Sequence, residues 1–152
     1  MSDFEKKAIS VSREVDASPS DVWAVLSDGW LYPCWVVGAA RMRDVDPRWP
    51  ERGSLLHHSV GNWPFLIDDK SEVLDMVPER SLRLRAHGWP AGAAEVLIEI
   101  EEQGDGCLLT IREDAVEGPA TLVPRPARQG TIAPRNREAL RRLGFLAEGR
   151  RR

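Results

Sequence analysis

The chain has 152 residues, a mass of 17.0 kDa and a formal net charge of −3. This length is enough for a hydrophobic core, and 42% apolar with 30% charged residues is ordinary for a soluble globular protein. No apolar run is long enough to span a bilayer, and the negative charge does not favour nucleic acid as a partner. We therefore expect one domain over residues 1–152, with no membrane span.

The N-terminal segment and the two cysteines bear on the cellular compartment of the protein. The first residues, MSDFEKK, are polar and lack the apolar core of a secretion signal. Cys34 and Cys107 lie in apolar surroundings far apart in the sequence, which favours buried free thiols over a disulfide. We expect a cytoplasmic location.

The first elements are a strand and two short helices. Residues 8–15 alternate apolar and polar side chains, which predicts a half-buried strand. Ser18 has the features of a helix N-cap, with Pro19 at the first helical position, and Gly29 ends this helix. A second short helix follows at Pro33. We expect both helices to close one end of a cavity, with Trp23 in a lid rather than in a core element.

The pattern then changes to strands, which the intervening turn signals arrange as an antiparallel meander. Six segments fit this pattern: 39–46, 53–61, 65–76, 81–87, 93–103 and 107–118.

The end of the chain has two parts. Residues 118–134 contain four prolines and two glycines, which argues against one long regular element there. Residues from 135 onward are helical in pattern, with one apolar stripe and arginines opposite. The stripe consists of Ile132, Asn136, Ala139, Leu140, Leu143, Leu146 and Ala147. We therefore predict an α+β fold in which a seven-stranded antiparallel curved sheet surrounds a long C-terminal helix, with a cavity beside the helix.

The basic end of the chain has two interpretations. Residues 118–152 hold nine arginines and two glutamates, which can form a patch for nucleic acid or an anionic membrane. Apart from Phe145 this segment lacks aromatic side chains that could stack on bases, so a solvated helix face is the simpler interpretation.

The chain resembles a known superfamily, the helix-grip fold of START-like proteins, often called SRPBCC. The resemblance rests on VSREVDASPSDVWAVLSD near the start, on the order of elements, and on LRRLGFLAEG in the closing helix. LLHHSVGNWP and REDAVEGP are similar to a little-characterised bacterial subgroup. The superfamily includes polyketide cyclases and dehydrases, lipid-transfer domains and pollen allergens, so the resemblance implies a hydrophobic cavity and leaves the reaction open.

Glu113 is the first candidate for a functional group. In the strand 107–118 it shares a face with Leu109 and Ile111, which predicts an acid on an apolar, inward face. Such a group could act as general acid, base or ligand anchor. The alternative is a structural ion pair with an arginine such as Arg125 or Arg128.

His58 is the second candidate. Adjacent strand residues face opposite ways, so His57 and His58 cannot hold one metal ion together, and no zinc-type ligand spacing is present. If Leu56 and Val60 mark the inner face, His58 faces inward, either as a proton shuttle or as a satisfied polar residue. We expect no metal and no cofactor.

Other residues complete the expected ligand-binding set. Asp69 faces the cavity if its strand is in the matching register; the alternative is a solvated strand end. The aromatic side chains Trp35, Trp63 and Trp89 and the helix residues Leu140 and Leu143 are expected to line the cavity.

Three functions fit these features. The first is binding of a small hydrophobic ligand such as a lipid, a polyketide or an aromatic compound. The second is an enzyme resembling a polyketide cyclase or dehydrase, with Glu113 or His58 moving protons. The third is a protein-interaction module that uses the basic helix. The sequence leaves the oligomeric state, including a homodimer, open.

Overall fold

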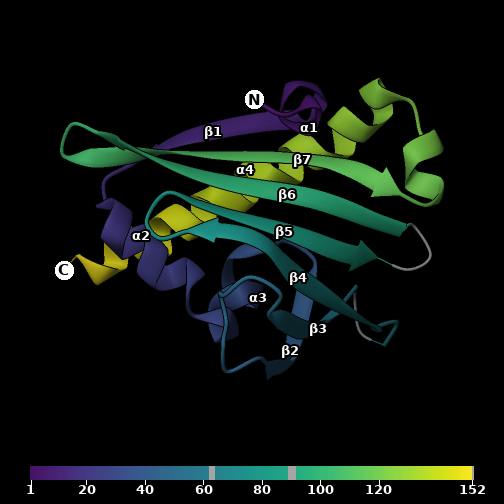
Figure 1. The fold of residues 1–152 in the computed structure, drawn as a ribbon, viewed down its shortest axis with the longest axis horizontal. Helices are drawn as coiled ribbons and strands as arrows, with labels where there is room; N and C mark the ends of the chain where they lie inside the picture. Colours follow the sequence, from purple (N-terminus) through teal and green to yellow (C-terminus); the bar gives the residue numbers. More distant parts are fainter. Residues whose placement is uncertain (62–63, 89–91, 152) are drawn as a thin grey trace.

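A single seven-stranded antiparallel sheet forms the body of the molecule (Figure 1). The computed structural model describes residues 1–61, 64–88 and 92–151. The strand order is β1-β7-β6-β5-β4-β3-β2, so β2 to β7 form the predicted meander and β1 closes against β7. The strands are β1 Ile9–Val15, β2 Ala39–Val45, β3 Leu55–Val60, β4 Ile67–Val77, β5 Ser81–Gly88, β6 Gly92–Gln103 and β7 Gly106–Glu117.

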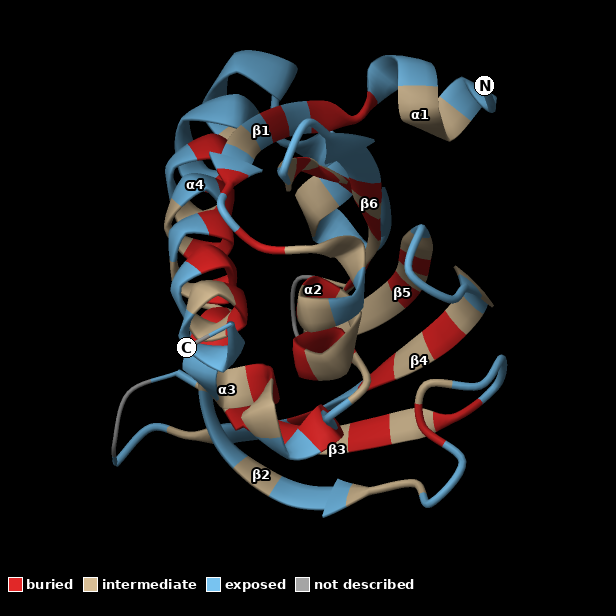
Figure 2. Cartoon of the chain, turned by 90° about the vertical axis from the view of Figure 1, so that its left-hand side faces the viewer, coloured by how far each residue is buried: buried red, intermediate tan, exposed pale blue. Residues whose placement is uncertain are grey.

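The helices lie at the ends of the chain and between β1 and β2. They are α1 Asp3–Lys7, α2 Pro19–Leu26, α3 Tyr32–Trp35 and α4 Arg125–Arg150, with 3-10 turns η1 Gly29–Leu31 and η2 Pro119–Leu122. Figure 2 shows α4 facing the curved sheet, with α2 and α3 on the same side of the sheet. The predicted helix-grip architecture is confirmed.

The outer face of the sheet is polar, as the strand alternation predicts. Arg83 of β5 forms an ion pair with Glu95 of β6 at 2.7 Å, and Arg112 of β7 pairs with Glu99 of β6 at 3.2 Å. Such cross-strand pairs stabilise one register of the sheet. They also fix which side chains face inward toward α4.

The helix α2 belongs to the core, which corrects the expectation of a lid. Its residues Val22, Val25 and Leu26 are buried, and the helix packs against α4. Trp23 packs partly buried against the core cluster. The indole Nε1 of Trp49 donates a hydrogen bond to the Leu26 carbonyl oxygen at 3.1 Å, which satisfies a free carbonyl at the end of the helix.

The helix α4 begins ten residues earlier than the proline content indicates. Pro126 lies in the first turn, where backbone N–H groups have no acceptor within the helix. Its missing N–H therefore does not prevent helix formation. Pro134 lies inside the helix and removes one backbone hydrogen bond. Packing of the following residues compensates, since Ala139, Leu140 and Leu143 are buried.

Two smaller features differ from the sequence predictions. The short α1 was not anticipated; it is fixed by a capping box between Ser2 and Glu5. Both cysteines are free, as predicted, but only Cys107 is buried and Cys34 is exposed. None of the described helices is long and apolar enough to cross a membrane.

The capping box of α2 gives a test of the local sequence signal. The Ser18 hydroxyl accepts a hydrogen bond from the Asp21 backbone N–H at 3.1 Å. We predict that Ser18→Ala lowers the free energy of unfolding by about 1 kcal/mol, because the N–H loses its partner. Urea denaturation measures this. The control is Ser20→Ala, an exposed position of the same helix, which should leave stability unchanged; equal effects of the two variants would contradict the assignment.

Candidate functional site

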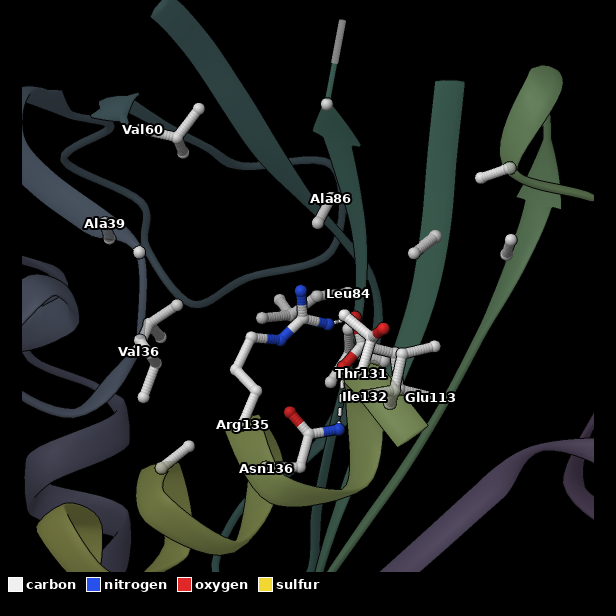
Figure 3. Close-up of a pocket in the computed structure, with 18 of the residues that line it drawn as sticks. Val36, Ala39, Val60, Leu84, Ala86, Glu113, Thr131, Ile132, Arg135 and Asn136 are labelled. Atoms are coloured by element: carbon white, nitrogen blue, oxygen red, sulfur yellow. Dashed lines mark hydrogen bonds and ion pairs between the residues drawn. The ribbon is translucent and has the colours of Figure 1, made fainter. Parts of the chain in front are cut away.

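A cavity of about 520 Å³ lies between the sheet, α3 and α4. This volume falls within the range of small-molecule sites, about 300–1,000 Å³. Its walls come from the inner faces of β3 to β7, from α3 and the turn after it, and from the first half of α4. Figure 3 shows side chains from these elements pointing toward a common space.

Small side chains form the floor of the cavity. Ala86 of β5 pairs with Ala94 of β6, which pairs with Ala115 of β7, so three methyl groups lie side by side across the sheet. At the other end of these strands, Leu82 pairs with Ile98, and both are fully buried. Because interiors are close-packed, the large residues fill their end while the alanines leave space under α4.

Glu113 projects from β7 into the space between sheet and helix (Figure 3). Its Oε1 accepts a hydrogen bond from the Arg135 guanidinium at 2.5 Å, and its Oε2 accepts one from the Asn136 amide at 2.7 Å. The side chain of Glu113 is 8% exposed and that of Arg135 is 38% exposed. The carboxylate is therefore buried and fully partnered, and its arginine reaches the cavity surface.

The partner of Glu113 differs from the two arginines suggested by the sequence. Arg128 instead binds Asp114 at 2.8 Å, and Arg125 donates to the Lys7 carbonyl oxygen at 3.3 Å. Arg135 lies seven residues, about two helical turns, beyond Arg128 along α4, opposite Glu113 of β7. The kind of interaction could be foreseen, but the exact arginine could not, because the start of α4 was misplaced.

His58 faces inward, as its strand alternation predicts. Its Nε2 lies 3.0 Å from the Ser71 hydroxyl, which lies 3.0 Å from the Tyr32 hydroxyl. The His58 and Tyr32 rings stack, with centroids 5.2 Å apart. Burial lowers the pKa of His58 from its usual value and raises the pKa of Tyr32 to about 12, so both groups are neutral at neutral pH.

Asp69 lies beside His58 on the cavity wall, directly opposite it in the β3–β4 pairing. Its Oδ1 accepts a hydrogen bond from the Lys70 N–H at 2.8 Å. The guanidinium of Arg43 approaches from the strand β2 and donates to the Asp69 carbonyl oxygen at 2.9 Å. Asp69 is thus buried and lines the cavity, as in the inward alternative, although β4 begins only two residues before it, at Ile67.

The other expected ligand-binding residues divide into three groups. Trp35 lines the cavity from α3, where it contacts Tyr32 edge to face. Leu140 and Leu143 are not among the described lining residues; they lie fully buried in the core, further along α4. Trp63 and Trp89 lie outside the described residues.

Several lining residues were not identified from the sequence: Tyr32, Ala86, Ala94, Ala115, Thr131 and Arg135. The sequence does contain a signal for the alanines. They occupy inward positions of strands whose other inward positions carry mostly leucine, isoleucine or valine. The described residues contain no group of three or more His, Cys, Asp or Glu side chains placed to hold a metal ion.

Solved structures share this fold. Protein NE0264 from Nitrosomonas europaea is 15% identical, with a TM-score of 0.74 over 99% of both chains. Protein CV1439 from Chromobacterium violaceum is 16% identical, with a TM-score of 0.71 over 93% of this chain and 98% of that chain. The di-domain ARO/CYC StfQ from the steffimycin biosynthetic pathway is 14% identical, with a TM-score of 0.71 over 96% of this chain and 53% of that chain. At these identities the likeness concerns the fold alone.

The sequence itself gives the family. No curated protein matches the chain. Residues 6–148 match the family described as polyketide cyclase / dehydrase and lipid transport, which is nearly the whole chain. Together with the helix-grip fold, this match establishes that the chain belongs to the polyketide cyclase/dehydrase and lipid transport family of the START-like (SRPBCC) superfamily.

Proposed function

We propose that the chain binds a small, largely apolar molecule in the cavity between the sheet and α4. The observation that carries the proposal is the 520 Å³ space above the alanine floor, which has apolar walls and a few inward polar groups. Removal of apolar ligand surface from water supplies about 25 cal/mol per Å², before the cost of association. The polar groups then set the orientation of the ligand.

The two polar groups first suggested as catalytic differ in what they can do. The Glu113 carboxylate is held by Arg135 and Asn136, whose hydrogen bonds occupy both of its oxygens. It is therefore suited to joining sheet and helix, and to presenting Arg135 at the cavity. His58 is neutral and keeps one ring nitrogen without a described partner, which favours it as the proton-transfer group of the cyclase-like alternative.

Filling the cavity tests the binding proposal. We predict that the double variant Ala86→Phe/Ala94→Phe weakens binding of the fluorescent probe 8-anilinonaphthalene-1-sulfonate at least tenfold, because two aromatic rings occupy the floor. Fluorescence titration of the folded variant measures this. Ala40→Phe adds the same ring at an exposed position of β2 and should leave the probe affinity unchanged. Undiminished binding by the double variant would place the probe elsewhere and remove the proposal.

A substitution at Glu113 tests whether this residue stabilises the fold rather than contacting the ligand. We predict that Glu113→Gln lowers the free energy of unfolding by about 1–3 kcal/mol, because Arg135 and Asn136 lose a charged acceptor. Probe affinity should change less than threefold. Glu99→Gln removes a comparable ion pair on the outer face and should cost less than about 1 kcal/mol. Loss of probe binding with full stability would instead make Glu113 a direct ligand contact.

The pH dependence of stability tests the neutral state of His58. The unfolded chain takes up a proton near the ordinary pKa of 6.5, whereas burial delays this uptake to lower pH in the folded chain. The unfolded state then binds more protons, so stability should fall as the pH drops below 6.5, by at most about 1.4 kcal/mol per pH unit.

Denaturation of His58→Phe between pH 7.5 and pH 5 should lack this contribution, whereas His57→Phe should keep it. Identical pH profiles for the wild type and His58→Phe would show that His58 ionises alike in the folded and unfolded chains.

A further inference from the structure

His58 and Asp69 form a pair of buried polar residues on the cavity wall. They are directly opposite each other in neighbouring antiparallel strands, so their side chains project from the same face of the sheet. Their exposed fractions are 3% and 8%, and both residues line the cavity. They lie on β3 and β4, whereas Glu113 lies on β7.

Each residue of this pair has one polar atom without a hydrogen-bond partner among the described residues. These atoms are Nδ1 of His58 and Oδ2 of Asp69. A buried polar atom without a partner costs about 1–3 kcal/mol, and native structures contain few of them. By contrast, both carboxylate oxygens of Glu113 are partnered.

Gly88 is the described residue of β5 that lies beside the Asp69 carboxylate. Gly88 of β5 also lines the cavity, and a Cβ atom placed on it would lie 3.9 Å from Asp69 Oδ2. Any side chain at this position would project into the space next to the carboxylate. With glycine at this position no Cβ atom stands between this buried oxygen and the cavity side of β5.

The hydrogen-bond chain behind His58 determines which atom carries its proton. Tyr32 retains its phenolic proton, and Ser71 is its only partner among the described residues. If Tyr32 donates to Ser71 and Ser71 donates to Nε2 of His58, both hydroxyl protons have an acceptor, and the ring proton is on Nδ1. In any other arrangement the proton of Tyr32 or of Ser71 has no acceptor among these groups. The wall therefore presents an N–H donor beside a carboxylate acceptor.

We propose that this pair binds a hydroxyl group on the apolar ligand, which accepts from Nδ1–H of His58 and donates to Oδ2 of Asp69. The inference rests on the proposed ligand-binding function and specifies the ligand as an alcohol or a phenol. A methyl group leaves both atoms unpartnered, and a carboxylate is repelled by Asp69. An ammonium group can donate to Asp69 but cannot accept from Nδ1–H.

A matched pair of probes tests the inference on the wild-type chain. 2-Naphthol and 2-methylnaphthalene have nearly the same shape and differ in the hydroxyl group. Their affinities follow from displacement of 8-anilinonaphthalene-1-sulfonate. We expect 2-naphthol to bind at least about tenfold more tightly, because only it satisfies both buried atoms.

Substitutions at His58 and Asp69 test whether these two residues cause the tighter binding of 2-naphthol. His58→Phe keeps an aromatic ring against Tyr32 and removes both ring nitrogens, and Asp69→Leu removes the acceptor at similar volume. Both should reduce the preference for 2-naphthol to less than threefold while retaining 2-methylnaphthalene, and His57→Phe should retain the full preference. A preference that survives in both variants would place the hydroxyl elsewhere and overturn the inference.

The wild-type measurements also separate this inference from the proposed function. Equal affinities for the two probes would overturn the hydroxyl site, as expected if water occupies it, and would leave apolar ligand binding intact. Failure of all three compounds to bind would remove both proposals. Long-range ¹H–¹⁵N NMR of the His58 ring should show the proton on Nδ1, and a proton on Nε2 would contradict the hydroxyl assignment.

Discussion

The carboxylate of Glu113 joins β7 to α4 across the edge of the hollow, and the shape of the site depends on this connection. At the far end of α4, Leu140 and Leu143 pack fully buried into the core. Toward the start of α4 the floor of the cavity is formed by Ala86, Ala94 and Ala115, whose side chains are too short to reach the helix. Arg135 and Asn136 bridge the gap by hydrogen bonds to Glu113. An ion pair of Arg128 with Asp114 adds a second polar contact nearer the start of the helix. The helix is thus held by apolar packing toward its C-terminal end and by polar contacts toward its start, where the cavity lies over the alanines. A uniformly apolar interface would close this space.

The polar groups of the cavity serve two different purposes. The Glu113 network is complete without a ligand and belongs to the architecture. His58 and Asp69 each keep one polar atom without a hydrogen-bond partner among the described residues. Only Nε2 of His58 is satisfied, by Ser71, which in turn contacts Tyr32. An unsatisfied buried polar group costs stability, and the hydroxyl-binding proposal accounts for this cost at His58 and Asp69. The family description, which joins cyclases with lipid transport, is compatible with either use.

Much of this arrangement could be predicted because strand alternation has a period of two. That period alone places Glu113 and His58 inward, and the Ser18–Pro19 pair marks the start of α2. Interactions between distant segments could not be predicted. The partner of Glu113 depends on where α4 begins, and prolines in its first turns concealed that start. Trp49, in the loop between β2 and β3, gave no periodic signal for its hydrogen bond to Leu26.

The central claim is that the space above Ala86, Ala94 and Ala115 is the binding site. Intermolecular NOEs between a naphthalene probe and ¹³C-labelled alanine methyl groups test it most directly. The account predicts NOEs to these three methyl groups and none to the exposed Ala40. NOEs confined to alanines outside the cavity, with none to the floor, would contradict it.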